Sequence, residues 1–219
     1  MLNPRAVLAV GCAGWLAACA SGAPTAPQAD IAKVVDVKST FGPQFEVTEV
    51  APTGIDPEML ASQKLPDGLT FDPKDCAQFA TGQMVPPGLK GNMAAVSAEG
   101  DGNRFIAIAV ETSEPVPFTD PGPNCQIVGF TGGQVRGTVK VVDAPQIEGI
   151  RTLGVHRVLQ TVIDGKASTG EVYNYSAHFG NYQIIVTANP LVLPDKPVAA
   201  VDTKRAQELL AAAVAAVER

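Results

Sequence analysis

Four successive stretches in the second half of the chain decide its fold: QVRGTVKVVD (134–143), TLGVHRVLQTVI (152–163), GEVYNYSAHF (170–179) and YQIIVTAN (182–189). Each is rich in β-branched or aromatic residues, the composition of a β-strand. The dipeptides Asp164-Gly165 and Gly180-Asn181 between them are typical of tight turns. Because consecutive strands joined by tight turns pair antiparallel, this region predicts a β-meander.

Shorter elements are expected on the N-terminal side of this meander. Strands are predicted at Phe45–Val50, Met93–Ala98 and Arg104–Thr112. Short helices are expected at Pro57–Ser62, at Asn124–Phe130, and after Asp72, which would cap a helix that has Pro73 at its first position. The run IAKVVDVKSTF from Ile31 reads either as a helix leading into the domain or as an edge strand.

The C-terminal segment predicts a helix that closes the domain. Asp202 or Thr203 would cap it. Its apolar residues recur on one side with helical spacing: Ala206, Leu209, Leu210, Ala213, Val214 and Val217. With no internal repeat and no second core, the sequence predicts a single α+β domain over residues 31–219, an antiparallel sheet flanked by helices.

The N-terminus indicates where the protein is located. Residues 1–18, MLNPRAVLAVGCAGWLAA, have one positive charge and then a short apolar run, as in a secretory signal peptide. The following LAAC, ending at Cys19, resembles the lipobox of bacterial lipoproteins. That resemblance implies cleavage before Cys19 and a diacylglycerol on its thiol, which would hold the protein on the extracytoplasmic face of the cell membrane. An ordinary signal peptide that happens to precede a cysteine is the alternative.

The segment after Cys19 and the remaining cysteines fit an exported protein. Residues 19–30 are small, polar and Pro-containing, as in a flexible tether between lipid and domain. Cys76 and Cys125 lie 49 positions apart and predict a disulfide, because cysteine pairs in exported proteins are usually oxidised. Closing a loop of about 50 residues stabilises a fold by about 4 kcal/mol in the chain-entropy model. A redox-active pair is the alternative, although the spacing is not that of Cys-x-x-Cys.

Composition argues against several classes of function. Sixteen basic and 22 acidic side chains give a net charge of −6, which disfavours a nucleic-acid partner. Two histidines and four cysteines at scattered spacings match no metal-site pattern, and no nucleotide-binding glycine motif is present. No catalytic constellation is visible either. We therefore expect no metal, no cofactor and no enzymatic activity.

Aromatic and basic residues in the meander are candidate ligand contacts. Tyr173, Tyr175 and Phe179 share one side of a predicted strand, where they form either core beneath the C-terminal helix or an aromatic-walled pocket. Arg157 stands between Val155 and Leu159 on an otherwise apolar side of its strand. If that side is buried, Arg157 requires a carboxylate partner. If it lines a cleft, Arg157 could hold an anionic ligand.

The two histidines are further candidates. His156 falls on the more polar side of its strand, and His178 shares a side with Asn174 and Ser176. Whether the two imidazoles face the same way depends on the pairing register, which a one-residue change in the connecting loop reverses. A shared face could sense pH or bind an anion, and two ordinary hydrogen-bonded strand histidines are the alternative.

Several segments resemble an uncharacterised family of mycobacterial cell-envelope lipoproteins: LPDGLTFDPKDC (65–76), GLKGNMAAVSAEG (88–100), LGVHRVLQTV (153–162) and YNYSAHFGNYQIIVTANP (173–190). That family is similar to the extracytoplasmic sensor domain of the mycobacterial serine/threonine kinase H. This sequence has one Cys pair where that domain has two. The resemblance implies a sheet with helices beside a cleft and a role in binding an extracellular ligand, and it assigns no functional residue.

These observations favour a membrane-anchored, ligand-binding or sensor-like accessory of the cell envelope, with an unknown small ligand as its partner. Two other functions remain open at this point. The domain could be an interaction module that scaffolds envelope proteins, for which an exposed sheet edge would be the sign. It could also carry lipids or glycolipids, for which a cavity of several hundred Å³ would be the sign.

Overall fold

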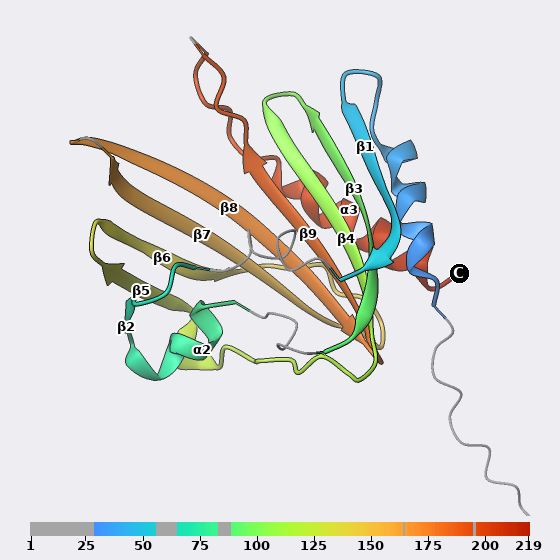
Figure 1. Cartoon of the computed structure of the whole chain (residues 1–219), viewed down its shortest axis with the longest axis horizontal. Helices are drawn as coiled ribbons and strands as arrows, with labels where there is room; N and C mark the ends of the chain where they lie inside the picture. Colours follow the sequence, from blue (N-terminus) through green and yellow to red (C-terminus); the bar gives the residue numbers. More distant parts are fainter. Residues whose placement is uncertain (1–28, 56–64, 83–88, 164, 195) are drawn as a thin grey trace, which may run out of the picture.

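A single antiparallel sheet organises the part of the chain that the computed structural model describes, residues 29–55, 65–82, 89–163, 165–194 and 196–219. Its strands are β1 (Glu46–Gly54), β2 (Thr70–Asp72), β3 (Gly91–Gly100), β4 (Asn103–Thr112), β5 (Ile127–Gly132), β6 (Val135–Val142), β7 (Arg151–Ile163), β8 (Lys166–Phe179) and β9 (Tyr182–Pro190). Their spatial order is β1-β3-β4-β9-β8-β7-β6-β5-β2 (Figure 1).

The predicted meander is confirmed and is longer than expected. Strands β5 to β9 follow one another side by side, and β8 begins at Lys166 rather than at Gly170. Beyond β9 the sheet continues with β4, so that the hairpin β3–β4 joins it out of sequence order. This hairpin turns at Asp101 and Gly102, whose positive φ angles of 51° and 76° match the tight turns that hairpins favour.

One side of the sheet is covered by two helices, η1 (Ile31–Thr40) and α3 (Thr203–Val217) (Figure 1). The segment from Ile31 is therefore a helix and not an edge strand. It is a 3-10 helix, and its buried residues Ile31, Val34 and Val37 recur every three positions, which is its own turn length. The strands below present small residues that allow α3 to approach closely: Ala94, Ala98, Ala107, Ala109, Ala177 and Ala188, all fully buried.

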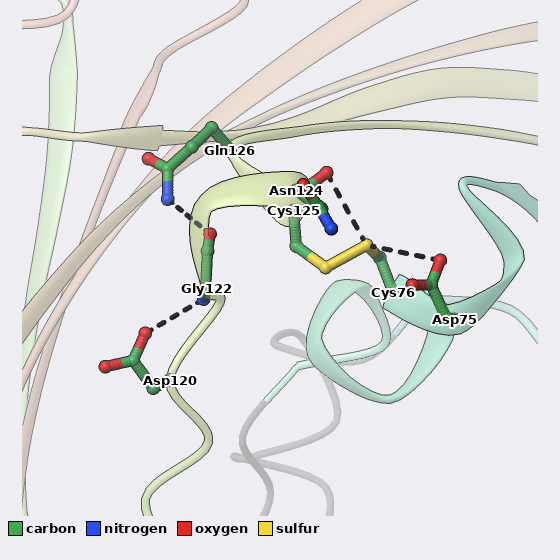
Figure 2. The surroundings of a disulfide bond; sticks show 7 residues. All are labelled: Asp75, Cys76, Asp120, Gly122, Asn124, Cys125 and Gln126. Carbon is green, nitrogen blue, oxygen red and sulfur yellow. Dashed lines mark hydrogen bonds between the residues drawn. A yellow bond between two sulfur atoms is a disulfide. The ribbon is translucent and has the colours of Figure 1, made fainter.

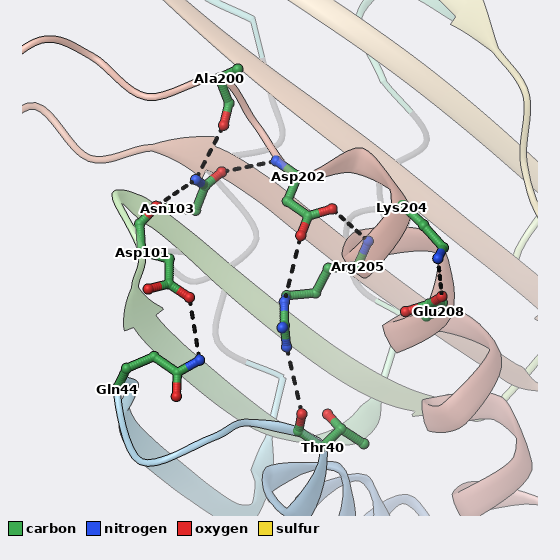
Figure 3. A network of polar contacts seen from close by, with 9 residues as sticks. All are labelled: Thr40, Gln44, Asp101, Asn103, Ala200, Asp202, Lys204, Arg205 and Glu208. Carbon is green, nitrogen blue, oxygen red and sulfur yellow. Dashed lines mark hydrogen bonds and ion pairs between the residues drawn. The ribbon is translucent and has the colours of Figure 1, made fainter.

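The closing helix is fixed at its N-terminus by a polar network (Figure 3). Asp202 is the cap, and its carboxylate accepts from the backbone N–H of Arg205 at 2.9 Å. The buried Asn103 side chain donates to the Ala200 carbonyl and accepts from the Asp202 N–H, both at 3.2 Å. The Arg205 guanidinium reaches the Thr40 carbonyl at 3.5 Å. These contacts join α3 to η1 and to the β3–β4 hairpin. The predicted apolar stripe of α3 is buried throughout.

The other side of the sheet is partly covered by a disulfide-linked unit of η2 (Lys74–Cys76), α2 (Ala77–Ala80) and η3 (Pro123–Cys125). The predicted Cys76–Cys125 bond is present, with a Cα–Cα distance of 5.5 Å (Figure 2). It joins the chain after β2 to the chain before β5. Phe79 and Ala80 of α2 are buried in the same cluster as Val128 and Val139 of the sheet.

Local expectations failed around this cover. The segment Asn124–Phe130 is not a helix: η3 ends at Cys125 and β5 follows, because its residues pair with β6. Asp72 does not cap a helix but ends β2, and Pro73 takes the cap position with no side-chain hydrogen bond. The helix expected at Pro57–Ser62, the signal segment and Cys19 lie outside the described residues. None of the helices in the described ranges has the length and apolar character needed to cross a membrane.

Candidate functional site

The pairing of β7 with β8 separates the predicted site residues onto two faces of the sheet. His156 lies opposite Tyr173, and Arg151 lies opposite His178. Because side chains alternate along a strand, His156 shares the α3 side with Tyr173, Tyr175 and Phe179. His178 points to the side of the disulfide-linked cover. The register question that the sequence left open is thus answered: the two imidazoles face opposite ways.

On the α3 side, Tyr175 and Phe179 are part of the core beneath α3 and are 1% and 8% exposed. Tyr173 is half-buried, and its ring stacks on His156 with centroids 4.0 Å apart and planes 8° from parallel. His156 Nε2 lies 2.8 Å from a carboxylate oxygen of Glu171. The three aromatic residues therefore do not wall one pocket together, and Tyr175 and Phe179 fit the core interpretation.

On the cover side, a cavity of about 60 Å³ lies between α2 and the strands β7, β8 and β9. Its polar lining comes from Arg157, Asn174, Ser176 and Gln183. Its apolar lining comes from Phe79 of α2 with Leu153, Val155 and Ile185 of the strands. Of the residues singled out from the sequence, Arg157 lines this cavity directly, and His178 lies beside its residues Ser176 and Gln183.

Burial perturbs the ionisable groups of this region. Arg157 is only 6% exposed, and loss of hydration lowers the pKa of its guanidinium to about 10. His178 is also 6% exposed. Burial, together with the positive charge of Arg151, lowers the pKa of its imidazole to about 4, so that His178 is neutral at pH 7. The rings of His178 and Phe118 pack nearly perpendicular to each other, with centroids 5.1 Å apart.

His178 has two polar neighbours on this face. Its Nε2 lies 3.4 Å from the Gln183 side-chain amide and 3.3 Å from the Ser176 hydroxyl. Among the described residues, His178 Nδ1 and Gln183 Oε1 are buried and have no hydrogen-bond partner. Leaving such a group unsatisfied costs about 1–3 kcal/mol, so these atoms mark a region not optimised for stability alone.

A second hollow lies on the α3 side, beyond the part of the sheet that α3 covers. It is an open groove of about 730 Å³ along β2, β5, β6 and β7. Thr131, Arg136, Thr138 and Gln160 line it, and the Arg136 guanidinium donates to the Gln160 amide oxygen at 2.8 Å. Within the described ranges, no three His, Cys, Asp or Glu side chains gather as metal ligands.

Part of the cavity was visible in the sequence. The alternation of β8 had put His178, Asn174 and Ser176 on one side. Gln183 and Phe79 were missed. Gln183 interrupts a largely apolar strand, which was the available signal, whereas nothing local connects Phe79 to strands about 75 to 105 residues further along the chain.

Comparisons with known proteins place this architecture in a family. An X-ray structure of an uncharacterised protein of Mycobacterium smegmatis, described as the Rv0999 ortholog, is 65% identical; the match covers 88% of this chain and 99% of that one, with a TM-score of 0.83. The extracellular domain of PknH from Mycobacterium tuberculosis matches at 10% identity over 85% of this chain and 92% of its own, with a TM-score of 0.37. Comparison with curated proteins found no match. Residues 30–218 match the domain of unknown function DUF5642, and the chain belongs to that family.

Proposed function

We propose that this protein is a ligand-binding, sensor-like accessory of the mycobacterial cell envelope, held on the extracytoplasmic face of the membrane by a lipid on Cys19. The observation that carries the binding role is the cavity between α2 and strands β7–β9, with the buried Arg157 in its wall. The lipobox-like sequence ending at Cys19 supports the location. The role is one of binding, without metal, cofactor or catalysis.

The buried polar groups of this cavity lower the stability of the fold, which a purely structural domain would gain nothing from. His178 and Gln183 are each at least nine-tenths buried, and each has a side-chain atom without a hydrogen-bond partner among the described residues. Burying polar and ionisable groups in place of apolar ones costs stability unless they are well paired. Perturbed pKa values in a cleft concentrate at functional sites. This combination supports ligand binding.

The sheet edges argue against a scaffold that works by strand addition. The edge strand β1 carries the charged residues Glu46 and Glu49, contains Pro52, and breaks its register between Val50 and Thr53. Charge, proline and a bulge are devices that prevent another strand from pairing. The opposite edge, β2, is three residues long. A protein partner would therefore have to bind elsewhere.

The dimensions of the site argue against a lipid carrier. Carriers and other small-molecule sites have cavities of about 300–1,000 Å³. The cavity at Arg157 has about 60 Å³, and the space beneath α3 is filled by buried side chains such as Tyr175 and Leu210. The groove of about 730 Å³ along β2, β5, β6 and β7 is large enough, but it is open to solvent and does not enclose an acyl chain. A small ligand fits this arrangement better than an acyl chain.

Native mass spectrometry of the full chain tests the binding role. The protein is extracted from its own membranes with a mild detergent and is compared with an Arg157→Gln variant. A defined added mass on the wild type that is lost in the variant is the expected result. Repeated spectra of bare wild-type protein from varied extracts would refute ligand binding and favour a protein partner.

The anchor is tested separately by Cys19→Ala. This variant lacks the thiol that would accept the lipid, so we expect it to leave the membrane fraction and lose the mass of a diacylglycerol. Ser21→Ala, two positions away, is the matched control and should stay with the membranes. Unchanged fractionation of Cys19→Ala would overturn the proposed anchor.

A further inference from the structure

We propose that the cavity between α2 and strands β7–β9 binds a small uncharged polyol, a molecule of the size of glycerol whose hydroxyl groups meet Gln183, Ser176 and Asn174. This inference rests on the proposed binding function and names the class of ligand. Three features of the cavity carry it: a buried acceptor on Gln183, neighbouring groups that donate and accept hydrogen bonds without charge, and a wall that is apolar on its other side.

Gln183 provides a buried acceptor that requires a donor. Its side chain lines the cavity, and the residue is 1% exposed. The amide nitrogen lies 3.4 Å from His178 Nε2, and Oε1 has no hydrogen-bond partner among the described residues. Because a buried acceptor without a partner lowers stability, a ligand that brings a donor is favoured. A hydroxyl group is such a donor.

Ser176 and Asn174 add both kinds of hydrogen-bonding group to the same wall. The Ser176 hydroxyl lies 3.3 Å from His178 Nε2 and can donate or accept. The Asn174 oxygen accepts from the Thr187 hydroxyl at 3.1 Å, so the group that Asn174 offers a ligand is its NH₂ donor. A hydroxyl group both donates and accepts, and a molecule with several hydroxyl groups therefore matches this mixture.

The charge of the wall favours an uncharged ligand. Among the described residues that line the cavity, Arg157 is the one ionisable side chain, and it has an interaction of its own within the protein. An uncharged ligand leaves that interaction in place. An anion would compete for the guanidinium, and a cation would be repelled by it.

Size and apolar lining limit the rest of the ligand. At about 10–15 Å³ for each water-sized atom, 60 Å³ holds about four to six heavy atoms, and glycerol has six. Phe79, Leu153 and Ile185 form apolar walls. Water alone would turn hydrogen-bonding groups toward these walls, whereas the carbon atoms of a polyol can lie against them. A polyol therefore fits both sides of the cavity.

An NMR titration of the isotope-labelled full chain in mild detergent tests the assignment, with glycerol, n-propanol and propionate as probes. The backbone amide signals of Asn174, Ser176 and Gln183 report on the cavity. Glycerol should shift them and bind about five- to a hundredfold more tightly than n-propanol, which lacks two of its hydroxyl groups. Propionate, which is charged, should bind more weakly than glycerol. No shift with glycerol, or binding of either other probe as tight as that of glycerol, would overturn the proposal.

Variants locate the contacts. Gln183→Leu, similar in size and without the acceptor, should weaken glycerol binding by about two- to tenfold and leave n-propanol binding unchanged. Gln44→Leu is the matched control, because Gln44 is exposed and its amide donates to Asp101 at 3.3 Å, and neither residue lines the cavity. Glycerol binding that is equal in Gln183→Leu and Gln44→Leu would overturn the proposal.

Two further measurements keep the test decisive. If Gln183→Leu does not fold, as judged by thermal unfolding, Ser176→Leu fills the cavity from β8 and should abolish glycerol binding while Gln183 remains. Unchanged binding in Ser176→Leu would refute the location. If native mass spectrometry finds an envelope ligand without a polyol group, the binding function stands and this inference falls. The mass of a ligand that has one distinguishes a free polyol from the end of a larger molecule. If neither an envelope ligand nor any probe binds, both fall.

Discussion

Replacing His178 by glutamine should change how the stability of the protein depends on pH. In the folded protein, burial and the charge of Arg151 lower the pKa of His178 from 6.5 to about 4. Between those two values the unfolded chain binds a proton at this position and the folded chain does not. Stability from His178 is therefore fully present above about pH 6.5 and is lost as the pH falls toward about 4.

The size of the effect follows from the two pKa values. One pKa unit corresponds to 1.36 kcal/mol, so the interval from 6.5 to about 4 gives a loss of about 3 kcal/mol. Glutamine keeps a polar group of similar reach and does not titrate. The free energy of unfolding of His178→Gln should thus fall by about 3 kcal/mol less than that of the wild type over the same pH range.

Urea unfolding of both proteins at a series of pH values measures this difference directly. Carboxyl groups titrate in the same range, but they are common to both proteins and cancel in the comparison. An NMR titration of the His178 ring protons gives the pKa itself. Parallel stability curves, or a measured pKa at or above 6.5, would refute the conclusion that His178 is desolvated and neutral.

Other predictions concern the elements that hold the site in place. Cys76→Ser combined with Cys125→Ser should lower the free energy of unfolding by about 4 kcal/mol, because a loop spanning 49 positions is released; a loss under about 1 kcal/mol in chemical denaturation would contradict this. Asn103→Ala should cost about 2–3 kcal/mol, because the contacts of the buried amide to Ala200 and Asp202 are lost; thermal unfolding of both proteins measures it, and no loss would contradict it. Leu210→Ala should cost about 2–5 kcal/mol by leaving a cavity beneath α3, and an unchanged urea midpoint would contradict that packing.

The local sequence pattern was sufficient to predict the longer strands and the C-terminal helix. The alternation in β6 to β8, the apolar run in β9 and the stripe of α3 each carry their own signal, and the structure confirms these elements. The sequences of strands β2 and β5 carry almost no such signal. β2 has three residues and exists because it pairs with β5, and the pairing of β4 with β9 joins segments about 80 positions apart. Such pairings depend on tertiary contacts that a local pattern does not contain.

The sequence predicted which site residues share a face within one strand, but not which of them meet across neighbouring strands. Alternation within β8 put His178 with Asn174 and Ser176, and alternation within β7 put Arg157 among apolar residues. Whether these two groups meet depends on the register across the β7–β8 turn, where a shift of one position sends every side chain to the other face. In the structure Arg157 lies opposite Val172, which brings the polar side of β8 to the arginine.

The same register determines which side chains of β8 lie beside Arg157. A carboxylate on β8 lies one position from the residue opposite Arg157, but it is Glu171, which points to the α3 side and lies 2.8 Å from His156. Exchanging the residues at 171 and 172 would put a carboxylate directly opposite Arg157. The chain instead has Val172 there and keeps its glutamate on the other face. The register across the β7–β8 turn therefore decides that Glu171 lies beside His156 and that the residue opposite Arg157 is apolar.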